Sequence, residues 1–538
     1  MLLSPTPPSG KMAAPMDLAP APPIERVSEV EARVEHIRRT AGFLVAPAVF
    51  VALLAAPLGL AAPAHRLAAI LAAVVVLWVC ESLPLAITAI LGPILAVVLQ
   101  VAPARQVFAS FADPVVFVFI GGFMLAEAMF VHRLDRRIAF AALASRFVGS
   151  SAARALIVYG AVTTFISAWI SNVATTAMMY PIGLAMAAHV VGAGERDDAP
   201  LPDAAAAGGR SPGRSPAARF ALGMMLITSF GASVGGLATP VGTPPNLIGM
   251  GLIERVGGRK VTFLEWTALG LPAALILFGV VAAMFVWTCG RGLQLSTGGR
   301  AAVAAELKRL GPLSRGERNV LIAFGVTVLL WVAPGLLAIA GQGESAFARG
   351  LQASVPESVA AMLGATLLFL LPVHWTRRQF TLTWDQAARI EWGIVLLYGG
   401  GLALGDLAFT TGLAKALGEG LTSWTPAPTT FALTVLFTGV AIVLSETTSN
   451  TASANMIVPV AIAVAKASGV DPLAPALAAT LGASMGFMMP ISTPPNAIVY
   501  GSGHVPLTAM MRFGVVLDLA GFVVIVALVT WLVPVVFR

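Results

Sequence analysis

Apolar runs of about 20 residues, the length that crosses a lipid bilayer as a helix, recur along most of the chain. Hydrophobic residues make up 57% of the 538 positions, and charged residues make up only 11%. The runs do not alternate apolar and polar residues, as the strands of a membrane β-barrel would. Because backbone groups inside a bilayer must pair within their own segment, the sequence predicts an all-α polytopic membrane protein.

Three phrases of the sequence occur twice, in the same order. The first pair shares a Gly-Gly start and an acidic end, the second shares a Ser-Asn pair with a later Met and Pro, and the third shares Thr-Pro-Pro-Asn. The copies are Gly121–Glu127 and Gly400–Asp406, Ser171–Pro181 and Ser449–Pro459, and Pro240–Asn246 and Pro490–Asn496. Ordered recurrence of this kind indicates an internal duplication, so we expect two similar halves.

We divide the chain into a tail, two transmembrane halves and a linker. Residues 1–40 are rich in Pro and Ala and then charged, without the apolar core of a signal peptide, which predicts a largely disordered cytoplasmic tail. Apolar runs fill residues 41–290 and 319–538, and residues 291–318 between them are basic. The halves are therefore expected to be joined by a cytoplasmic linker.

Each half is predicted to contain a re-entrant hairpin and a broken helix. The Ser-Asn pair lies in the middle of a long apolar segment, where a single tilted span would be most apolar, and this favours a hairpin with the pair at its tip. The Pro-Pro pair interrupts another apolar segment. The hairpins are placed at about 156–190 and 430–465, and the broken helices at about 220–252 and 472–500.

The distribution of basic residues predicts the topology. With a cytoplasmic amino terminus, the tail, the Arg-rich segment 133–154, a polar loop at 192–219, the linker and Arg377–Arg389 all lie on the cytoplasmic side. This topology has about eleven spanning helices besides the hairpins, and an odd number of spans separates equivalent elements. The halves are therefore predicted to be inverted repeats, a layout common in secondary transporters.

The net charge of +7 does not indicate a nucleic-acid partner, because the basic residues lie in short loops between spans. Arginine far outnumbers lysine, and Ala and Gly are abundant. Such a composition suggests a GC-rich bacterial genome, and hence a multi-pass protein of the bacterial inner (plasma) membrane.

The repeated motifs place helix-breaking residues and oxygen-bearing side chains inside apolar segments. Unpaired backbone groups in a bilayer are costly, so these breaks need a partner. Carbonyls with Ser, Thr and Asn oxygens suit a small hard cation such as Na⁺, whereas the amino-terminal ends of the broken helices favour an anion. No Arg or Lys lies within the motifs, so the pattern favours a cation-coupled carrier of a small anion.

The two Ser-Asn motifs and the paired Gly-Thr-Pro-Pro-Asn and Ser-Thr-Pro-Pro-Asn phrases resemble those of the divalent anion/sodium symporter family, which carries dicarboxylates, tricarboxylates or sulfate. The resemblance covers about residues 115–538. It implies a homodimer in which each protomer has a scaffold part and a transport part that moves by elevator-like alternating access. Val173 departs from the usual Thr at the third motif position, which removes a hydroxyl from one side of the site.

Family positions carried over residue by residue imply a substrate site with two Na⁺ sites beside it, so two or more coupling ions are expected. The substrate-facing positions are Ser171, Asn172, Val173, Thr243, Pro244, Ser449, Asn450, Thr451, Thr493 and Pro494. One Na⁺ site corresponds to Ser167, Asn172 and Gly242, and the other corresponds to Ser445, Thr448, Asn450 and Ser492.

Together these features predict a secondary active transporter that couples Na⁺ to a C4 dicarboxylate such as succinate, malate or fumarate. The alternatives within transport are a sodium-independent dicarboxylate exchanger, a proton-coupled carrier, a tricarboxylate or sulfate carrier of the same fold, and a passive channel. No appended soluble domain of the kind seen in some sulfate carriers is present, which favours carboxylates.

An intramembrane serine hydrolase is the alternative from another class. Gly231–Gly235 and Gly482–Gly486 both match Gly-x-Ser-x-Gly, the phrase around the nucleophile of many hydrolases. Small residues in membrane helices more often serve close packing, and a hydrolase would need one such phrase, not two related by duplication. We therefore expect no enzyme activity.

Three acidic residues lie in or near spans. Glu127 and Asp406 occupy equivalent positions, and intramembrane carboxylates are costly and often functional, although both equally fit helix caps. Glu446, three residues before Ser449, is expected to hold the tip of the second hairpin in shape rather than to bind a cation.

Overall fold

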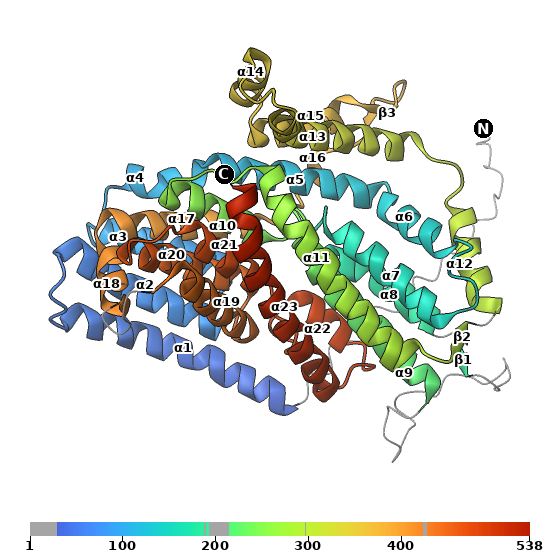
Figure 1. Cartoon of the computed structure of the whole chain (residues 1–538), viewed down its shortest axis with the longest axis horizontal. Coiled ribbons are helices and arrows are strands. Elements are labelled where there is room, and N and C mark those ends of the chain that lie inside the picture. The colour runs from blue at the N-terminus through green and yellow to red at the C-terminus, as the bar shows by residue number, and fades with distance from the viewer. Residues whose placement is uncertain (1–28, 188–189, 193–214, 296, 423–427, 538) are drawn as a thin grey trace, which may run out of the picture.

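The structure is a computed structural model that describes residues 29–187, 190–192, 215–295, 297–422 and 428–537 (Figure 1). Within these ranges, nine helices are long and apolar enough to cross a membrane. The number becomes ten if Ala346–Ser354 and Glu357–Leu370, which are bent by 66° at their junction, form one span. This architecture confirms the prediction of an all-α polytopic membrane protein.

The described residues of the first half run from the amino-terminal helix to a short strand. The elements are α1 (Glu29–Ala55), α2 (Ala62–Cys80), α3 (Leu85–Val98), α4 (Ala104–Phe108), the 3-10 turn η1 (Ala109–Ala112), α5 (Pro114–Val131), α6 (Leu134–Leu143), α7 (Ala152–Ser167), α8 (Asn172–Ala187), β1 (Val190–Gly192), α9 (Pro216–Gly236), α10 (Pro244–Leu252), the π-helical turn η2 (Ile253–Gly257), α11 (Phe263–Phe285), the π-helical turn η3 (Val286–Gly290) and β2 (Leu293–Leu295). Strands β1 and β2 pair antiparallel, with Val191 opposite Gln294.

The second half follows the linker helix α12 (Thr297–Arg309). Its elements are α13 (Arg315–Ile339), α14 (Ala346–Ser354), α15 (Glu357–Leu370), β3 (Pro372–His374), β4 (Gln379–Phe380), α16 (Trp384–Ala387), α17 (Trp392–Thr410), α18 (Leu413–Thr422), α19 (Thr430–Thr447), α20 (Asn450–Ala467), α21 (Leu473–Gly482), α22 (Pro494–Tyr500) and α23 (Leu507–Val536). Strands β3 and β4 form a second antiparallel pair.

The element boundaries refine the predicted division of the chain. Helix α1 begins at Glu29, so the described end of the predicted 1–40 tail is helical. The rest of that tail, and residues 193–214 of the predicted polar loop, lie outside the described residues. Two of the eleven predicted spans contain short helices, since α3 has 14 residues and α21 has 10.

Each predicted hairpin consists of two helices that meet at the Ser-Asn pair. Helix α7 ends at Ser167 and α8 begins at Asn172, and the two pack against each other and against α9 (Figure 1). Helix α19 ends at Thr447 and α20 begins at Asn450, and both pack against α21. Their insertion as re-entrant hairpins stays a prediction, because it concerns their position in a bilayer.

The contacts between the two halves come in equivalent pairs. Helix α5 of the first half packs against α15 of the second, and its counterpart α17 packs against α3 of the first. In the same way, α9 contacts α22 and its counterpart α21 contacts α10. Small residues permit these approaches. A Cβ at Gly121 would lie 2.6 Å from the Ala361 carbonyl carbon, and one at Gly400 would lie 2.1 Å from the Ala89 carbonyl oxygen. The duplicated Gly-Gly phrase therefore marks crossings between the halves.

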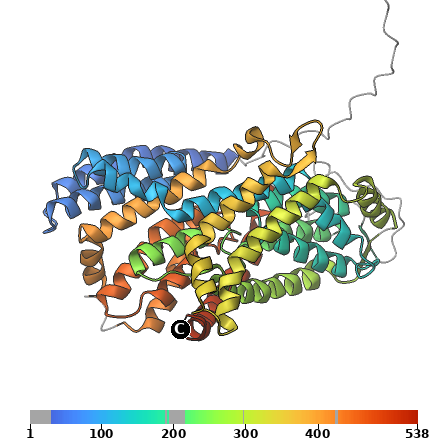
Figure 2. The same cartoon turned by 90° about the horizontal axis from the view of Figure 1, so that it is seen from above.

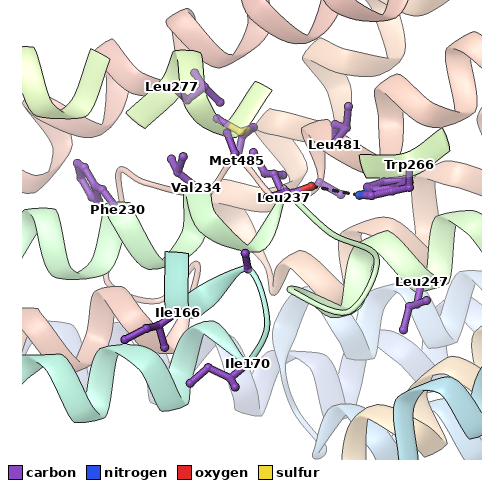
Figure 3. Close-up of a cluster of buried hydrophobic side chains, with 14 of the residues drawn as sticks. Ile166, Ile170, Phe230, Val234, Leu237, Leu247, Trp266, Leu277, Leu481 and Met485 are labelled. Atoms are coloured by element: carbon purple, nitrogen blue, oxygen red, sulfur yellow. Dashed lines mark hydrogen bonds between the residues drawn. The ribbon is translucent and has the colours of Figure 1, made fainter. Parts of the chain in front are cut away.

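A continuous apolar core joins the hairpin regions of the two halves. Figure 3 shows Phe230 and Val234 of α9 beside Met485, which follows α21. The indole nitrogen of Trp266 donates a hydrogen bond of 3.1 Å to the Leu237 carbonyl, at the point where α9 ends. Two views agree that the amino-terminal helices lie at one end of the molecule and the α7–α8 pair at the other (Figures 1 and 2).

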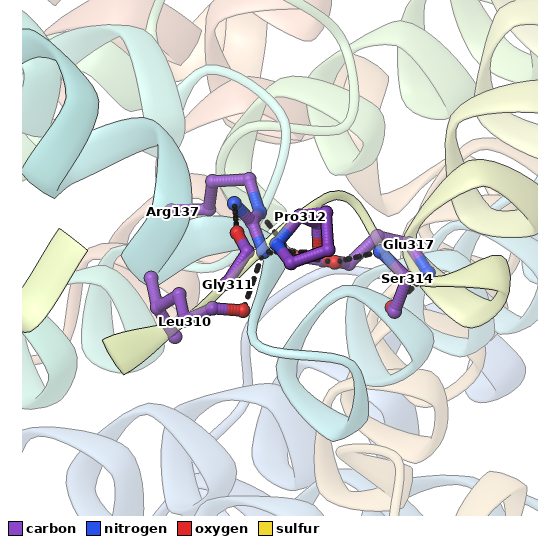
Figure 4. A network of polar contacts seen from close by, with 6 residues as sticks. All are labelled: Arg137, Leu310, Gly311, Pro312, Ser314 and Glu317. Carbon is purple, nitrogen blue, oxygen red and sulfur yellow. Dashed lines mark hydrogen bonds and ion pairs between the residues drawn. The ribbon is translucent and has the colours of Figure 1, made fainter. Parts of the chain in front are cut away.

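Arg137 of α6 holds the loop that leads from the linker into α13 (Figure 4). Its guanidinium contacts Glu317 in a bidentate pair at 2.5 and 3.2 Å, and donates to the carbonyls of Leu310, Gly311 and Pro312 at 2.9–3.2 Å. The Glu317 side chain is only 3% exposed and also forms a capping box with Ser314. This cluster fixes the start of the second half to the first.

Replacing Arg137 with Ala should markedly destabilise the protein, because it leaves the buried Glu317 carboxylate without its cation and removes the side-chain donor to three carbonyls. Breaking one side of a buried ion pair costs on the order of 3–5 kcal/mol. Thermal unfolding in detergent, followed by tryptophan fluorescence, measures the change. The matched control is Arg309→Ala, whose pair with Glu306 is 76% and 45% exposed and should contribute little. Equal melting temperatures for the two variants would contradict the role of Arg137.

Asp135 of α6 should make stability depend on pH. Its side chain is 2% exposed, and burial, partly offset by Arg136, raises its pKa to about 6. Between the unfolded pKa and about 6 the folded state binds more protons, so stability falls as pH rises through this window, by about 3 kcal/mol in total. Asp135→Asn should therefore melt at a higher temperature than the native chain at pH 7.5 and at a similar temperature at pH 4. The prediction would be contradicted if the melting temperature of the native chain rose as the pH increased from about 4 to about 6.

Candidate functional site

A cavity of about 430 Å³ lies where the repeated motifs of the two halves meet. All ten residues predicted to face substrate line it: Ser171, Asn172, Val173, Thr243, Pro244, Ser449, Asn450, Thr451, Thr493 and Pro494. Ser492, one of the predicted Na⁺ ligands, also lines the cavity. Residues that lie up to 323 positions apart in the sequence are thus brought together at one site.

Four helices begin at the cavity wall. Helices α8 and α20 start at the two Asn residues, and α10 and α22 start immediately after Thr243 and Thr493. The two threonines have nearly the same backbone conformation, with φ and ψ of −147° and 144° in one and −144° and 144° in the other. Positive partial charge at helix starts favours an anion. The first turns of α8 and α20 can also supply free N–H groups, whereas α10 and α22 begin with Pro-Pro pairs, which have no N–H.

The first hairpin presents a compact group of oxygen atoms next to the cavity. The Ser167 hydroxyl donates to Asn172 Oδ1 at 2.7 Å, and Asn172 Nδ2 lies 3.5 Å from the Thr243 hydroxyl. A Cβ at Gly236 would lie 2.5 Å from Asn172 Oδ1, and one at Gly242 would lie 2.6 Å from the Gly236 carbonyl oxygen. The two glycines therefore allow the hairpin tip and the broken helix to approach closely.

The second hairpin repeats this arrangement. The Ser445 hydroxyl donates to Asn450 Oδ1, again at 2.7 Å, and 278 positions separate each member of this pair from its equivalent in the first hairpin. A Cβ at Gly486 would lie 3.0 Å from Asn450 Oδ1. Thr448 is predicted to bind Na⁺ together with Ser445, Asn450 and Ser492. In the structure its hydroxyl instead donates to the Trp78 carbonyl at 3.3 Å.

A buried asparagine closes each helix break. Asn246 Nδ2 donates to the carbonyls of Gly236 and Thr239, both at 2.8 Å, and Asn496 Nδ2 donates to those of Gly486 and Met489, both at 3.0 Å. Gly236, Thr239 and Asn246 each lie 250 positions before Gly486, Met489 and Asn496, so the two halves use equivalent residues. Asn496 also accepts a bond from Ser229 at 2.5 Å, which ties the two halves together.

Glu446 anchors the second hairpin, as the sequence predicted. Its carboxylate accepts the backbone N–H groups of Phe487, Met488 and Met489 at 2.5, 2.8 and 3.2 Å. These residues lie in the break between α21 and α22. The carboxylate thus satisfies donors that would otherwise be unpaired inside the apolar core.

The oxygen groups suit Na⁺ by their chemistry. Hydroxyl, amide and carbonyl oxygens are the ligands that hard cations prefer, and Ser167, Ser445 and Ser492 are all buried. Across the ranges the structure describes, no group of three His, Cys, Asp or Glu residues is placed to hold a metal ion. The predicted Na⁺ ligands thus lie beside the cavity in two groups, and their assignment as ligands stays a prediction.

The opposite wall of the cavity was missed by sequence reasoning. It contains Pro84, Leu85 and Ala86 at the start of α3, and Glu391, Gly393, Ile394 and Leu397 at the start of α17. In the sequence, Pro84 indicates only a break within a long apolar run. In the sequence, Glu391 is an acidic residue directly before the apolar run of α17. Acidic residues are common at helix starts, so this position alone does not indicate a binding site.

The two equivalent acids have different surroundings. Asp406 accepts a bond of 2.7 Å from Arg255 of η2, and Arg255 also lies 3.6 Å from Asp113, which in turn accepts a bond from the Tyr398 hydroxyl at 3.0 Å. Asp406 therefore belongs to an ion-pair network that joins η2 to α17. Glu127 is half-buried on α5, and neither acid lines the cavity.

The serines of the two Gly-x-Ser-x-Gly phrases lie away from any catalytic arrangement. Ser233 and Ser484 are each 1% exposed, and neither hydroxyl has a hydrogen-bond partner within the described part of the chain. A serine nucleophile needs a base within hydrogen-bond reach. The two phrases instead place small residues where α9 and α21 pack against the hairpins.

These features define a polytopic helical carrier with its binding cavity between two duplicated halves. Comparison with known proteins specifies it further. The sequence profile described as the sodium:sulfate symporter transmembrane region matches residues 35–537. The chain therefore belongs to the sodium:sulfate symporter family, the divalent anion/sodium symporters.

Individual relatives agree with this assignment, and two solved structures share the fold. The chain is 30% identical over 503 residues to the sodium-dependent dicarboxylate transporter SdcS of Staphylococcus saprophyticus, covering 93% of this chain and 92% of that protein. It is 29% identical over 461 residues to SdcS of Staphylococcus aureus, covering 85% and 84%. The fold resembles the YdaH transporter of Alcanivorax borkumensis, with a TM-score of 0.50, 14% identity and coverage of 80% and 87%. MtrF of Neisseria gonorrhoeae also gives 0.50, with 11% identity and coverage of 79% and 82%.

Replacing Asn246 or Asn496 with Ala should destabilise the protein and distort the cavity, because each change removes the side-chain donor that two buried carbonyls share. Each lost hydrogen bond costs about 0.5–1.5 kcal/mol, so the melting temperature should fall by several degrees. The matched control is Asn455→Ala, since the amide of Asn455 donates only to the Thr451 carbonyl of its own helix. If all three variants melt alike, the two amides do not hold the breaks.

Proposed function

We propose that this protein is a secondary active transporter that couples Na⁺ to the uptake of a C4 dicarboxylate such as succinate, malate or fumarate. The observation that carries the proposal is the cavity in which four helix starts, two from each half, meet Ser, Thr and Asn side chains. Among the described residues that line the cavity, none is Lys, Arg or His. A short dianion can direct one carboxylate toward each half, and the names of the SdcS relatives support the same substrate class.

Sodium ions supply the positive charge that the cavity side chains lack. Asn172 and Asn450 belong to both the substrate-facing and the Na⁺-binding sets, so cations at the hairpin tips would lie beside the carboxylates. Two opposite unit charges about 4 Å apart near a protein surface attract by about 4 kcal/mol. Binding of two or more Na⁺ before the anion would therefore make anion affinity depend on sodium, which is the basis of coupling.

The two walls of the cavity support an elevator-like mechanism. One wall consists of the hairpin tips and helix breaks, which Asn246, Asn496, Glu446 and Ser229 bind into one unit. The other wall consists of the starts of α3 and α17. Movement of the first unit along the second would carry the site across the membrane, and the contact of Arg255 with Asp406 would then break.

We also propose that the protein is a homodimer in the bacterial inner membrane, with its amino terminus in the cytoplasm. The support for this location is the bacterial origin of the relatives and the position of the basic segments on one side of the predicted topology. The homodimer rests on family resemblance. The lipid bilayer and the small anion are its other expected partners.

Uptake of labelled succinate into proteoliposomes tests the proposed function. An inward Na⁺ gradient should drive accumulation above equilibrium, whereas an equal choline gradient should not. Asn172→Ala and Asn450→Ala should each reduce sodium-driven uptake by about tenfold or more, because a hydrogen bond to a charged group contributes about 1.5–3 kcal/mol.

The control for these variants is Asn319→Ala, which removes an amide that bonds to Pro372 and Thr381 away from the cavity and should leave uptake largely intact. Equal uptake in sodium and choline that requires preloaded dicarboxylate would contradict sodium coupling and identify an exchanger. Uptake that never exceeds equilibrium would identify a passive channel. Competition by sulfate or citrate, but not by malate, would identify a different anion.

A further inference from the structure

Glu391 is the one charged side chain among the residues that line the cavity. It precedes the first residue of α17 and makes no capping hydrogen bond to that helix. Its Oε1 atom instead accepts a hydrogen bond of 3.0 Å from the hydroxyl of Ser171, at the tip of the first hairpin. A carboxylate is therefore hydrogen-bonded to a residue of the predicted substrate site.

No cation neutralises this carboxylate within the residues that the structure describes. The ion pairs found there involve other acids, and Ser171 is the one polar partner of Glu391. The remaining polar groups of the cavity are hydroxyls and amides. A bound anion would therefore meet a negative charge that nothing on the protein offsets.

The hydrogen bond to Glu391 also occupies the one proton that the Ser171 hydroxyl can donate. The same hydroxyl already accepts the N–H of Ala174 at 3.3 Å. The Ser171 hydroxyl can therefore donate either to a substrate carboxylate or to Glu391, but not to both at once. Among the described residues, the equivalent Ser449 makes no such bond to an acid.

We propose that Glu391 is a specificity-determining residue that competes with the substrate carboxylate for Ser171 and lowers the affinity of the cavity for highly charged anions. The inference rests on the proposed function, because it concerns the same cavity. Repulsion grows with the charge of the ligand, so a tricarboxylate is disfavoured more than a dicarboxylate. Glu391 thus contributes to selection of anions by their charge.

Binding of labelled succinate and of labelled citrate to the purified full-length protein in saturating Na⁺ tests the inference. Glu391→Gln keeps a hydrogen-bond acceptor for Ser171 but removes the charge. We expect the Kd for succinate to fall by about tenfold, the change that corresponds to one pKa unit of like-charge repulsion. The Kd for citrate should fall by a larger factor. Glu391→Asp, which keeps the charge, should show no such gain.

The control for loss of one acidic charge is Glu344→Gln, at an exposed position outside the cavity, which should bind both anions as the native chain does. An unchanged Kd in Glu391→Gln would overturn the inference while native binding still supports the proposed function. Weaker binding would also overturn it, because the carboxylate would then assist the anion, as it would through a bridging cation. If neither the native chain nor Glu391→Gln binds either anion, the proposed function fails and the inference fails with it.

Discussion

The arrangement of the site depends on satisfying backbone groups where helices break inside an apolar core. Each break takes carbonyls out of the regular helical hydrogen-bond pattern, and no water in a bilayer interior would pair with them. Asn246 and Asn496 solve this problem in the same way, each with one amide that donates to two carbonyls. The carboxylate of Glu446 does the converse for three freed N–H groups. With the breaks held, four helix starts can face a common cavity.

Much of this arrangement was predictable because it is encoded twice. A phrase such as Ser171-Asn172 has little meaning alone, but its second copy and the shared Thr-Pro-Pro-Asn indicate a duplicated site, and all ten predicted substrate-facing residues do line one cavity. The all-α fold followed from the apolar runs. The short helix α21 was harder to predict, because hydropathy cannot show where a buried helix ends.

The unpredicted features involve residues that occur once and act across long sequence separations. Glu391 lies 220 positions from Ser171, and Arg137 lies 180 positions from Glu317. Neither has a repeated counterpart or a local motif. Asp406 shows the same limit, since its equivalence to Glu127 in sequence did not indicate that only Asp406 would pair with Arg255. Duplication predicts shared parts of the site, whereas its asymmetric parts require the structure.

The four helix starts have a consequence for how such a carrier can change during evolution. Their attraction for anions comes from the main chain, through the helix dipoles of all four and the N–H groups at the starts of α8 and α20, so most single side-chain substitutions do not remove it. Side chains on the rim, such as Val173 and Glu391, can therefore vary with less risk to basic anion binding. New substrate ranges can then arise by changes at a few rim positions while the backbone framework stays the same.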